Sequence, residues 1–383
     1  MNNPRERVVL VAFGMIVRRF AFTQSKTLQA VIGHLRPGSA SGYVREWETI
    51  RSGLRALALC ALLCLLSVPL VVSAQRTVSI ANLIVSSAHL PLWIAGDNGL
   101  FAEHGIVAEI RIVNDAIHAI TPDTPFGVIG VPAAISAMAE GRDLKVVATL
   151  DSARVTGQLV AGRDIKTPGD LRGKRIGVNR VGTGSWIHSI LALNHLGLDP
   201  TRDEISFVEI LSVPQRVQGL EAGVIDATVV DPGQSVQLRT KGFNLLLDMY
   251  PADIQGVQSA LVVDGEYSRQ NPHVVERVVA TLIEGMAYSL AAQNADTAQK
   301  TLAARMKISA PAAAASAYRD FVWRANRKPY PSVTAMQNMQ RVMALNDPKV
   351  LDVKIENLID DTVVRQLDAS GHIDRVYVRH GVK

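Results

Sequence analysis

The apolar and polar positions of this chain alternate between strand-like and helix-like spacing from residue 76 onward. Val78 to Val85 is rich in β-branched residues and is predicted to be a strand, and Leu92 to Gly105 is predicted to be a helix that its last glycine ends. Val107 to Val113 alternates apolar and polar residues, which is typical of a half-buried strand. Phe126 to Gly130 forms a further short apolar strand, directly before a proline that suits the first turn of a helix.

The same alternation starts again after Asp164. Strands predicted at Arg175–Asn179 and Ile205–Ile210 flank a predicted helix from Ser185 to Leu196, and from His273 onward the pattern is mostly helical. Strands that alternate with helices over short loops predict α/β layers with mainly parallel sheets. The restart predicts a second lobe inserted into the first, and the helical tail is expected to return to the first lobe.

Residues 51–74 have the pattern of a secretory signal. Two arginines precede a long apolar run, and Val72 and Ala74 place small or aliphatic residues before a cleavage site. A transmembrane anchor is the alternative, because the uncharged stretch is about long enough to span a membrane. Pro69 and the Ser-Ala end favour cleavage after Ala74. Residues 1–50 are expected to be an upstream extension that is disordered or absent in the working protein.

The charge of the chain is concentrated in this leader. The full sequence of 383 residues has a formal net charge of +5. Nine Lys and Arg and three Asp and Glu fall in residues 1–74, which leaves 31 basic and 32 acidic residues in 75–383. A nearly neutral remainder gives no polyelectrolyte signal, so we expect no nucleic-acid partner. Cys60 and Cys64 lie in the apolar run of the leader, so the mature chain has neither a disulfide nor a thiol site.

Four segments of the mature chain carry a recognisable pattern. They are His89–Gly105, which ends Gly-Leu-Phe-Ala-Glu-His-Gly, then Phe126–Pro132, Asp170–Val178 and Gly219–Ala227. In this order they resemble the nitrate/sulfonate/taurine-type substrate-binding proteins of ABC transporters, whose superfamily includes binders of thiamine pyrimidine precursors. Each segment alone is a weak signal, whereas four in register over about residues 76–300 are specific.

The resemblance implies a two-lobed periplasmic-binding-protein-like fold of type 2, in which each lobe is a mainly parallel sheet flanked by helices and two crossover strands join the lobes. We expect 76–162 and 262–383 to form lobe 1 and 163–261 to form lobe 2, with hinges near Gln158–Asp164 and Ser259–Glu266. The resemblance also implies a periplasmic location, a small-molecule ligand held between the lobes, and delivery of that ligand to ABC permease and ATPase subunits.

Three strand-to-helix loops form the candidate ligand site, because ligands of open α/β sheets bind beyond the carboxyl ends of the strands. Hydroxyl groups in these loops and the free N–H groups of helix N-termini suit a sulfonate, carboxylate or nitrate-like oxyanion. The candidate ligand-binding residues are Ser86, Ser87, His89, Leu90, Val131, Thr183, Gly184, Ser185, Trp186 and Asp231.

Several of these residues have a purely structural alternative. Thr183 and Ser185 can cap a helix without touching a ligand. Trp186 can cover an apolar ligand body or pack in the core. Asp231, at the end of a predicted strand, can pair with a ligand amine or hold the hinge. Packing or a solvated helix face is the expectation for three residues of the helical tail, Trp323, Arg324 and Arg327.

The sequence has no pattern that predicts catalysis, and we predict no catalytic residue, no metal site and no cofactor. The nucleophile elbow, H-E-x-x-H, Walker A and dinucleotide-binding patterns are absent from it. We therefore predict a monomeric solute-binding component of an ABC importer that captures a small organic or inorganic anion, such as a sulfonate, nitrate or a taurine-like solute. A pyrimidine-precursor synthase-like enzyme and a ligand-binding sensory module of the same fold are the alternatives. The synthases use a cysteine-rich iron site, which the mature chain lacks.

Overall fold

The computed structural model describes residues 77–82, 86–113 and 116–382. The expected extension at 1–50 and the expected signal peptide at 51–74 lie outside these residues. Within the part of the chain that is described, no helix combines the length and apolarity needed to cross a membrane.

The first of two five-stranded sheets has the strand order β2-β1-β3-β10-β4. β1 runs parallel to both of its neighbours, and β10 runs antiparallel to β3 and β4. The strands are β1 (Thr77–Asn82), β2 (Val107–Ile112), β3 (Phe126–Gly130), β4 (Leu144–Thr149) and β10 (Ser259–Asp264). Side chains alternate between the two faces of β10, with Leu261 in one apolar core and Val262 in the other. Such burial on both faces explains why β3 and β10 are nearly continuous apolar runs in the sequence.

The second sheet repeats this plan with the order β7-β6-β8-β5-β9. β6 runs parallel to β7 and β8, and β5 runs antiparallel to β8 and β9. The strands are β5 (Gln158–Ala161), β6 (Arg175–Val178), β7 (Ser206–Glu209), β8 (Ala227–Val230) and β9 (Asn244–Asp248). We call the first sheet with its helices the first lobe, and the second sheet with its helices the second lobe. Both sheets are mixed, with four of their five strands running in one direction, and both are flanked by helices, which agrees with the predicted α/β class.

Two segments connect the lobes, residues 150–157 and 249–258. They lie against each other, since Arg154 and Gln255 form an isolated antiparallel bridge. Both segments precede the positions expected for the hinges, because Gln158 begins β5 of the second sheet and Ser259 begins β10 of the first. The sequence shows continuous β-rich runs at these points and does not mark where the chain leaves one sheet and enters the other.

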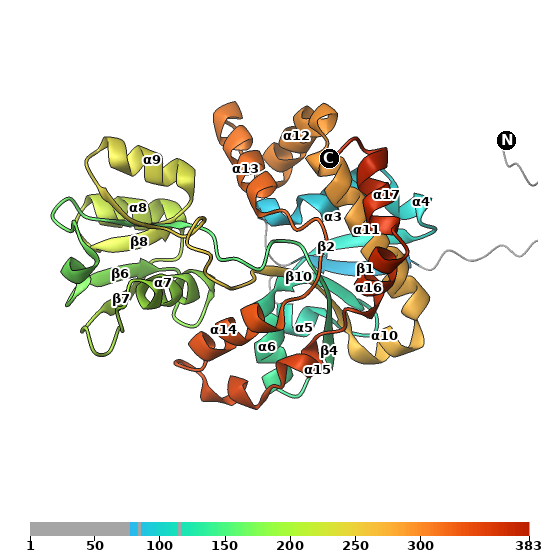
Figure 1. Cartoon of the computed structure of the whole chain (residues 1–383), viewed down its shortest axis with the longest axis horizontal. Helices are drawn as coiled ribbons and strands as arrows, with labels where there is room; N and C mark the ends of the chain where they lie inside the picture. The colour runs from blue at the N-terminus through green and yellow to red at the C-terminus, as the bar shows by residue number, and fades with distance from the viewer. Residues whose placement is uncertain (1–76, 83–85, 114–115, 383) are drawn as a thin grey trace, which may run out of the picture. The chain divides into compact units, whose positions relative to one another are not determined.

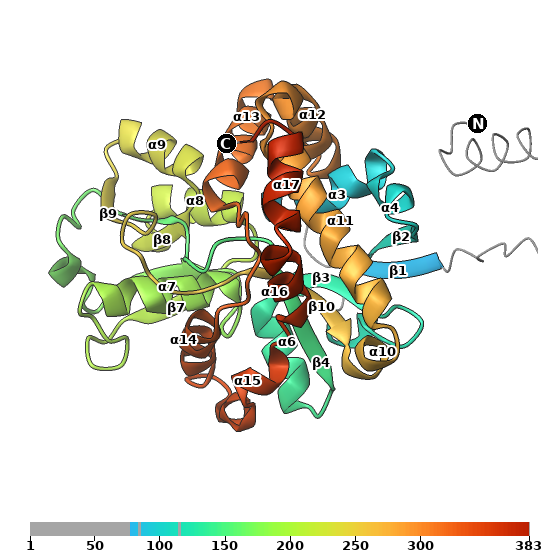
Figure 2. The ribbon, with the colours of Figure 1, turned by 45° about the vertical axis from the view of Figure 1, so that its right-hand side comes forward.

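The helices of the first lobe cover both faces of its sheet (Figures 1 and 2). They are α3 (Leu90–Asp97), α4 (Leu100–Glu103), α5 (Ala116–Ala119), α6 (Val131–Ala139), α10 (Gly265–Gln270), α11 (Pro272–Leu290), α12 (Ala295–Arg305), α13 (Pro311–Arg324), α14 (Val333–Met343), α15 (Ile355–Leu358), α16 (Thr362–Ala369) and α17 (His372–Arg379). The predicted helix over 92–105 is divided into α3 and α4, because Gly99 takes a left-handed conformation with φ 73°. α11 and α3 pack closely, and a Cβ on Gly285 would lie 2.3 Å from the carbonyl oxygen of Pro91.

Three helices flank the second sheet: α7 (Gly184–His195), α8 (Val213–Glu221) and α9 (Pro232–Thr240). Four short 3-10 turns, η1 (Ser87–His89), η2 (Pro168–Leu171), η3 (Ala292–Asn294) and η4 (Pro348–Asp352), complete the described elements.

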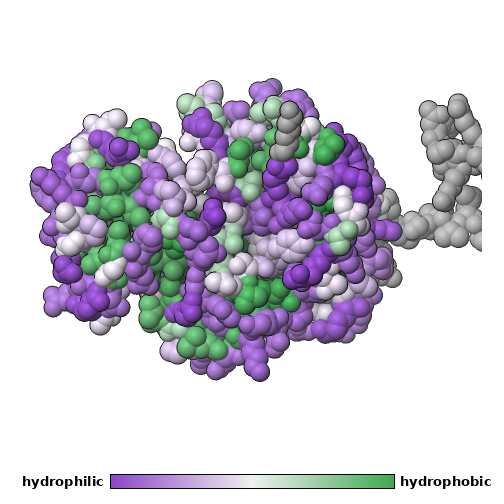
Figure 3. Space-filling model, in the orientation of Figure 1, coloured by the Kyte–Doolittle hydropathy of each residue, from purple (hydrophilic) through white to green (hydrophobic). Residues whose placement is uncertain are grey.

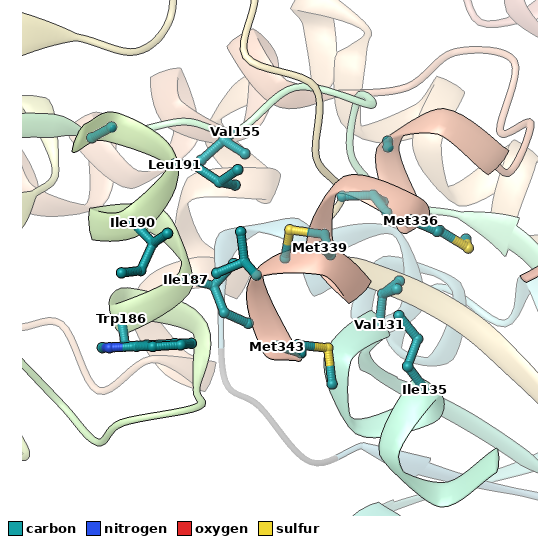
Figure 4. Packing of buried hydrophobic residues seen from close by; sticks show 14 of the residues in the cluster. Val131, Ile135, Val155, Trp186, Ile187, Ile190, Leu191, Met336, Met339 and Met343 are labelled. Carbon is teal, nitrogen blue, oxygen red and sulfur yellow. The ribbon is translucent and has the colours of Figure 1, made fainter. Parts of the chain in front are cut away.

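α14, from the helical tail, packs against α6 of the first lobe and α7 of the second. Its methionines Met336, Met339 and Met343 share one apolar core with Ile187 of α7 and Ile135 of α6 (Figure 4). The helical tail therefore packs on the first lobe and, through α14, also contacts the second lobe.

A groove of about 450 Å³ runs along the outer side of this contact. Its walls come from α7, α14 and the connecting segment 249–258. In the space-filling view, apolar residues gather along this lower junction between the lobes (Figure 3). The lining residues are Leu191, Asn194, His195, Asp199, Pro200, Ile254, Asn338, Arg341, Val342 and Leu345.

Candidate functional site

The predicted site residues of the first lobe fall into two groups. Ser86 caps η1 through its hydroxyl oxygen, which accepts from the N–H of Ala88 at 3.2 Å. Ser87 is buried and bonded to side chains of α13. His89 and Leu90 are fully buried, and the His89 ring meets the Trp93 ring edge-on. The polar end of this loop therefore points toward α13, whereas its apolar end packs inside the lobe.

The predicted residues around α7 are largely held by one another. Thr183 and Ser185 both donate to Oδ1 of Asn179, at 2.5 and 2.6 Å, which fixes the loop before α7. Gly184 between them is exposed. Trp186 is buried, meets Phe207 edge-on at a centroid distance of 6.0 Å, and belongs to the apolar core that includes α14. Val131 is also fully buried in that core.

A polar cluster that includes Ser87 lies where the lobes and the connecting segments meet. We call it the inter-lobe cluster: Ser87, Asp320 and Arg324 from the first lobe, Asp151, Tyr250 and Gln258 from the connecting segments, and His188 from the second lobe. Arg324 is at its centre and is only 8% exposed. Its Nη2 donates to Asp320 Oδ2 at 2.6 Å and to the Ser87 hydroxyl at 2.5 Å. Its Nη1 donates to Gln258 Oε1 at 3.2 Å.

The contact with Arg324 determines the protonation of His188. An arginine only donates, so Gln258 must turn its carbonyl oxygen to Arg324 and its amide nitrogen to His188, where the N–N distance is 3.0 Å. The facing nitrogen of His188 must then accept, which requires a neutral ring. Burial and the Arg324 charge act in the same direction and lower the pKa of His188 to about 4.

Two carboxylates compensate Arg324. Asp320 also accepts from the Tyr250 hydroxyl at 2.6 Å, so both of its oxygens are engaged. Asp151 is buried and accepts from the N–H of Ser259 at 3.1 Å. Burial raises the pKa of Asp151 to about 6, although the Arg324 charge opposes this. Burial also acts to lower the pKa of Arg324, but Asp320 and Asp151 outweigh it and the value is raised.

Asp231 and Trp323 lie at the open side of the inter-lobe cluster. Trp323 is 65% exposed and meets the ring of Tyr250 edge-on, with centroids 4.8 Å apart. Asp231 is exposed and precedes α9 of the second lobe. The first turn of α9 faces α13, since a Cβ on Gly233 would lie 3.2 Å from the Ser316 hydroxyl. Burial and the charge of Asp320 raise the pKa of Asp231, so the two carboxylates act on each other from opposite lobes.

The structure thus brings Ser87 and Asp231 of the predicted set to the cluster. It buries His89 beside Trp93 and places Leu90, Val131 and Trp186 in apolar cores. Arg324 and Trp323, which were expected to pack or face solvent, belong to the cluster and its rim. The one sequence signal for this was Asp320 and Arg324 at i, i+4, a spacing that is also common in surface ion pairs. Among the described residues, no group of three or more His, Cys, Asp and Glu side chains is arranged to hold a metal ion.

A His188→Gln variant is expected to reveal the cost of charging this histidine. The folded pKa of about 4 is below the unfolded value of about 6.5, so the stability that neutral His188 contributes is present at pH 7 and is lost as the pH falls toward 4. The difference in unfolding free energy between wild type and variant should fall by about 3 kcal/mol over this range. Urea unfolding at several pH values measures it. The opposite contribution of Asp151 is present in both proteins and cancels; a difference independent of pH would contradict the assignment.

A sequence model of one family identifies the chain. The model described as NMT1/THI5 like matches residues 86–296, which include η1, the connecting segments and the whole second lobe. This chain belongs to the NMT1/THI5-like family. The predicted resemblance is therefore confirmed. The matched residues end before α13 and α14. A search of curated proteins gives no match to this NMT1/THI5-like chain.

Solved structures share the fold of this NMT1/THI5-like protein. The periplasmic aliphatic sulphonate-binding protein SsuA from Escherichia coli aligns with a TM-score of 0.60 and 19% identity, over 74% of this chain and 92% of SsuA. The periplasmic nitrate-binding protein NrtA from Synechocystis PCC 6803 gives 0.56 and 13%, over 76% and 88%. A ligand-binding component of an ABC-type import system from Staphylococcus aureus, solved with zinc bound, gives 0.59 and 12%, over 76% and 98%. The predicted fold of the periplasmic binding proteins is confirmed.

Proposed function

We propose that this protein is the extracytoplasmic solute-binding component of an ABC importer, and that it holds a small solute between its two lobes without reacting with it. The observation that carries the proposal is the inter-lobe cluster. Its side chains come from the first lobe, from both connecting segments and from the second lobe. A solute placed there would contact every part of the protein that must move when such lobes close.

The solute class that we propose is a small anion of the sulfonate, nitrate or taurine-like kind, as the sequence resemblance implies. SsuA and NrtA, which share the fold, are named for binding aliphatic sulphonate and nitrate. The exposed ring of Trp323 beside Tyr250 offers an apolar surface for an organic portion of the solute. The partners in this proposal are an ABC permease and its ATPase, and the protein acts as a monomer.

A pyrimidine-precursor synthase-like enzyme is one alternative to this proposal. The pyrimidine-precursor synthases, as the resemblance implies, depend on cysteines, and the two cysteines of this sequence, Cys60 and Cys64, lie in the segment expected to be a signal peptide. A sensory module of the same fold would bind solute equally well. Uptake of the bound solute by vesicles that contain the permease and ATPase separates import from sensing.

The binding proposal is tested by titrating the purified protein with a panel of sulfonates, nitrate, carboxylates and pyrimidines in a calorimeter. At least one solute should bind in the micromolar range, about −8 kcal/mol. Trp323→Ala should weaken that binding roughly tenfold, because it removes a large exposed ring from the rim of the cluster.

The matched control is Val322→Ala, which changes the neighbouring residue of α13, itself 43% exposed. This variant should bind like wild type. Equal weakening by both variants would remove Trp323 from the site, and a panel without any binding would contradict the proposed function.

A further inference from the structure

The charges around the inter-lobe cluster do not balance. When all five groups are ionised, the carboxylates of Asp151, Asp231 and Asp320 exceed the guanidinium groups of Arg216 and Arg324 by one negative charge among these described residues. Arg324 is already engaged by Asp320, Ser87 and Gln258. An anion without a positive group would add to the excess and would have to compete with Asp320 for Arg324, which is costly in a partly desolvated site.

Asp231 is the carboxylate of this set that faces solvent. It precedes α9, and its own N–H donates to Gln234 Oε1 at 3.2 Å within the helix start. Asp320, across the lobe boundary, has both oxygens bonded to protein groups. A positively charged group of a solute can therefore reach Asp231 without breaking an existing ion pair. The exposed ring of Trp323 borders the same cluster through its contact with Tyr250, and an aromatic face attracts a cation.

Two buried donors in the same region lack acceptors. Nε of Arg216 and Nε of Arg324 are both inaccessible to solvent and find no hydrogen-bond acceptor within the described part of the chain. Arg216 is 4% exposed and is bonded through Nη1 to the carbonyl oxygen of Ile210 at 3.1 Å. Buried polar groups in native proteins nearly always have partners. These two nitrogens therefore indicate that acceptor oxygens of a bound molecule or of water complete the site.

We infer that the solute is a zwitterion, whose protonated nitrogen lies against Asp231 beside Trp323 while its acidic oxygens accept from Arg216 and Arg324. This inference rests on the proposed function and selects one class within it, the amino-bearing anions. Such a solute adds no net charge to the cluster. It supplies a donor for the solvent-facing carboxylate of Asp231, which also caps α9, and acceptors for Nε of Arg216 and Nε of Arg324.

The test uses matched solute pairs that differ only in an amino group, such as taurine and ethanesulfonate, or β-alanine and propionate. They are included in a calorimetric panel of sulfonates, carboxylates and pyrimidines. The tightest-binding solute should carry a protonated nitrogen and should bind at least about tenfold more tightly than its amine-free partner, as expected for hydrogen bonds to a charged group. A tightest binder without a protonated nitrogen would overturn the inference while leaving the proposed function standing. Absence of binding by every solute would instead overturn the proposed function, and the inference with it.

The Asp231→Asn variant removes the negative charge of this residue without removing its helix cap. Asparagine is as good a helix N-cap as aspartate, so the variant should fold normally. It should lose the preference for the amine-bearing partner and keep its affinity for the amine-free one. The matched control is Asp264→Asn, another N-cap, whose carboxylate accepts from the N–H of Tyr267 at 2.9 Å and which begins α10 on the far side of the first lobe (Figure 1). Retention of the amine preference in Asp231→Asn, or its loss in Asp264→Asn, would overturn the role of Asp231.

Discussion

Replacing Arg324 with methionine is expected to lower the free energy of unfolding by about 3–5 kcal/mol, because it leaves buried carboxylates without their cation. Asp320 loses a partner at 2.6 Å, and Asp151 loses the nearby positive charge that opposes its burial. The hydroxyl of Ser87 and the carbonyl of Gln258 lose their donor as well. Urea unfolding at pH 7.5, followed by circular dichroism, measures the loss.

Arg319→Met is the matched control, because Arg319 is an exposed residue of the same helix. Its effect should stay within about 0.5 kcal/mol. Adding Asp320→Asn to Arg324→Met should recover part of the loss, since it removes one of the carboxylates that the first change leaves uncompensated. A loss below about 1 kcal/mol for Arg324→Met would contradict the description of a buried, mutually dependent cluster.

Trp186→Ala is expected to destabilise the protein by about 3–5 kcal/mol, which is the range for deleting a buried aromatic side chain. The indole packs on Phe207 in the core that α14 shares with both lobes, and the residue is only 4% exposed. The remaining side chains come from several different elements, so they cannot all move to fill the space. Thermal and urea unfolding measure the change.

The same substitution at an exposed site provides the comparison. Trp323→Ala should cost less than about 1 kcal/mol of stability, because the Trp323 side chain is largely in solvent. Comparable losses of stability for the two variants would mean that Trp186 is not a core residue. The roles of the two tryptophans are thus expected to be opposite to those that the sequence suggested, with Trp186 supporting the fold and Trp323 contacting the solute.

Much of the fold was predictable because its strands are short apolar runs between glycine- and proline-marked turns. The strand at Phe126–Gly130 and the helix predicted over 185–196 agree closely with β3 and α7. The antiparallel insertion of β5 and β10 was not predictable, since a strand buried on both faces has the same residue pattern in either direction. The expected lobe boundaries, at residues 162/163 and 261/262, lie within a few residues of the connecting segments 150–157 and 249–258.

Fewer residues of the candidate site could be predicted from the sequence. Ser87 and Asp231 follow strand ends, and a general rule for open α/β sheets finds such positions. Arg324 reaches Ser87 across 237 residues of sequence, and His188 reaches Gln258 across 70. No local pattern encodes such a pairing. The loop before α7 was assigned to the site for its hydroxyls, but Asn179 already engages both of them.

The contact of α14 with both lobes makes the two sides of the lobe boundary unequal. On one side Met336, Met339 and Met343 form an apolar contact, and thioether chains change rotamer at little energetic cost. On the other side, ionic and amide groups hold one another at fixed distances. A rotation of the lobes can keep the methionine contact, because these side chains adjust, while it breaks the hydrogen bonds of the inter-lobe cluster. We therefore expect most of the free-energy cost of opening to come from the inter-lobe cluster. A solute bound at this cluster would then shift the equilibrium between the open and closed states.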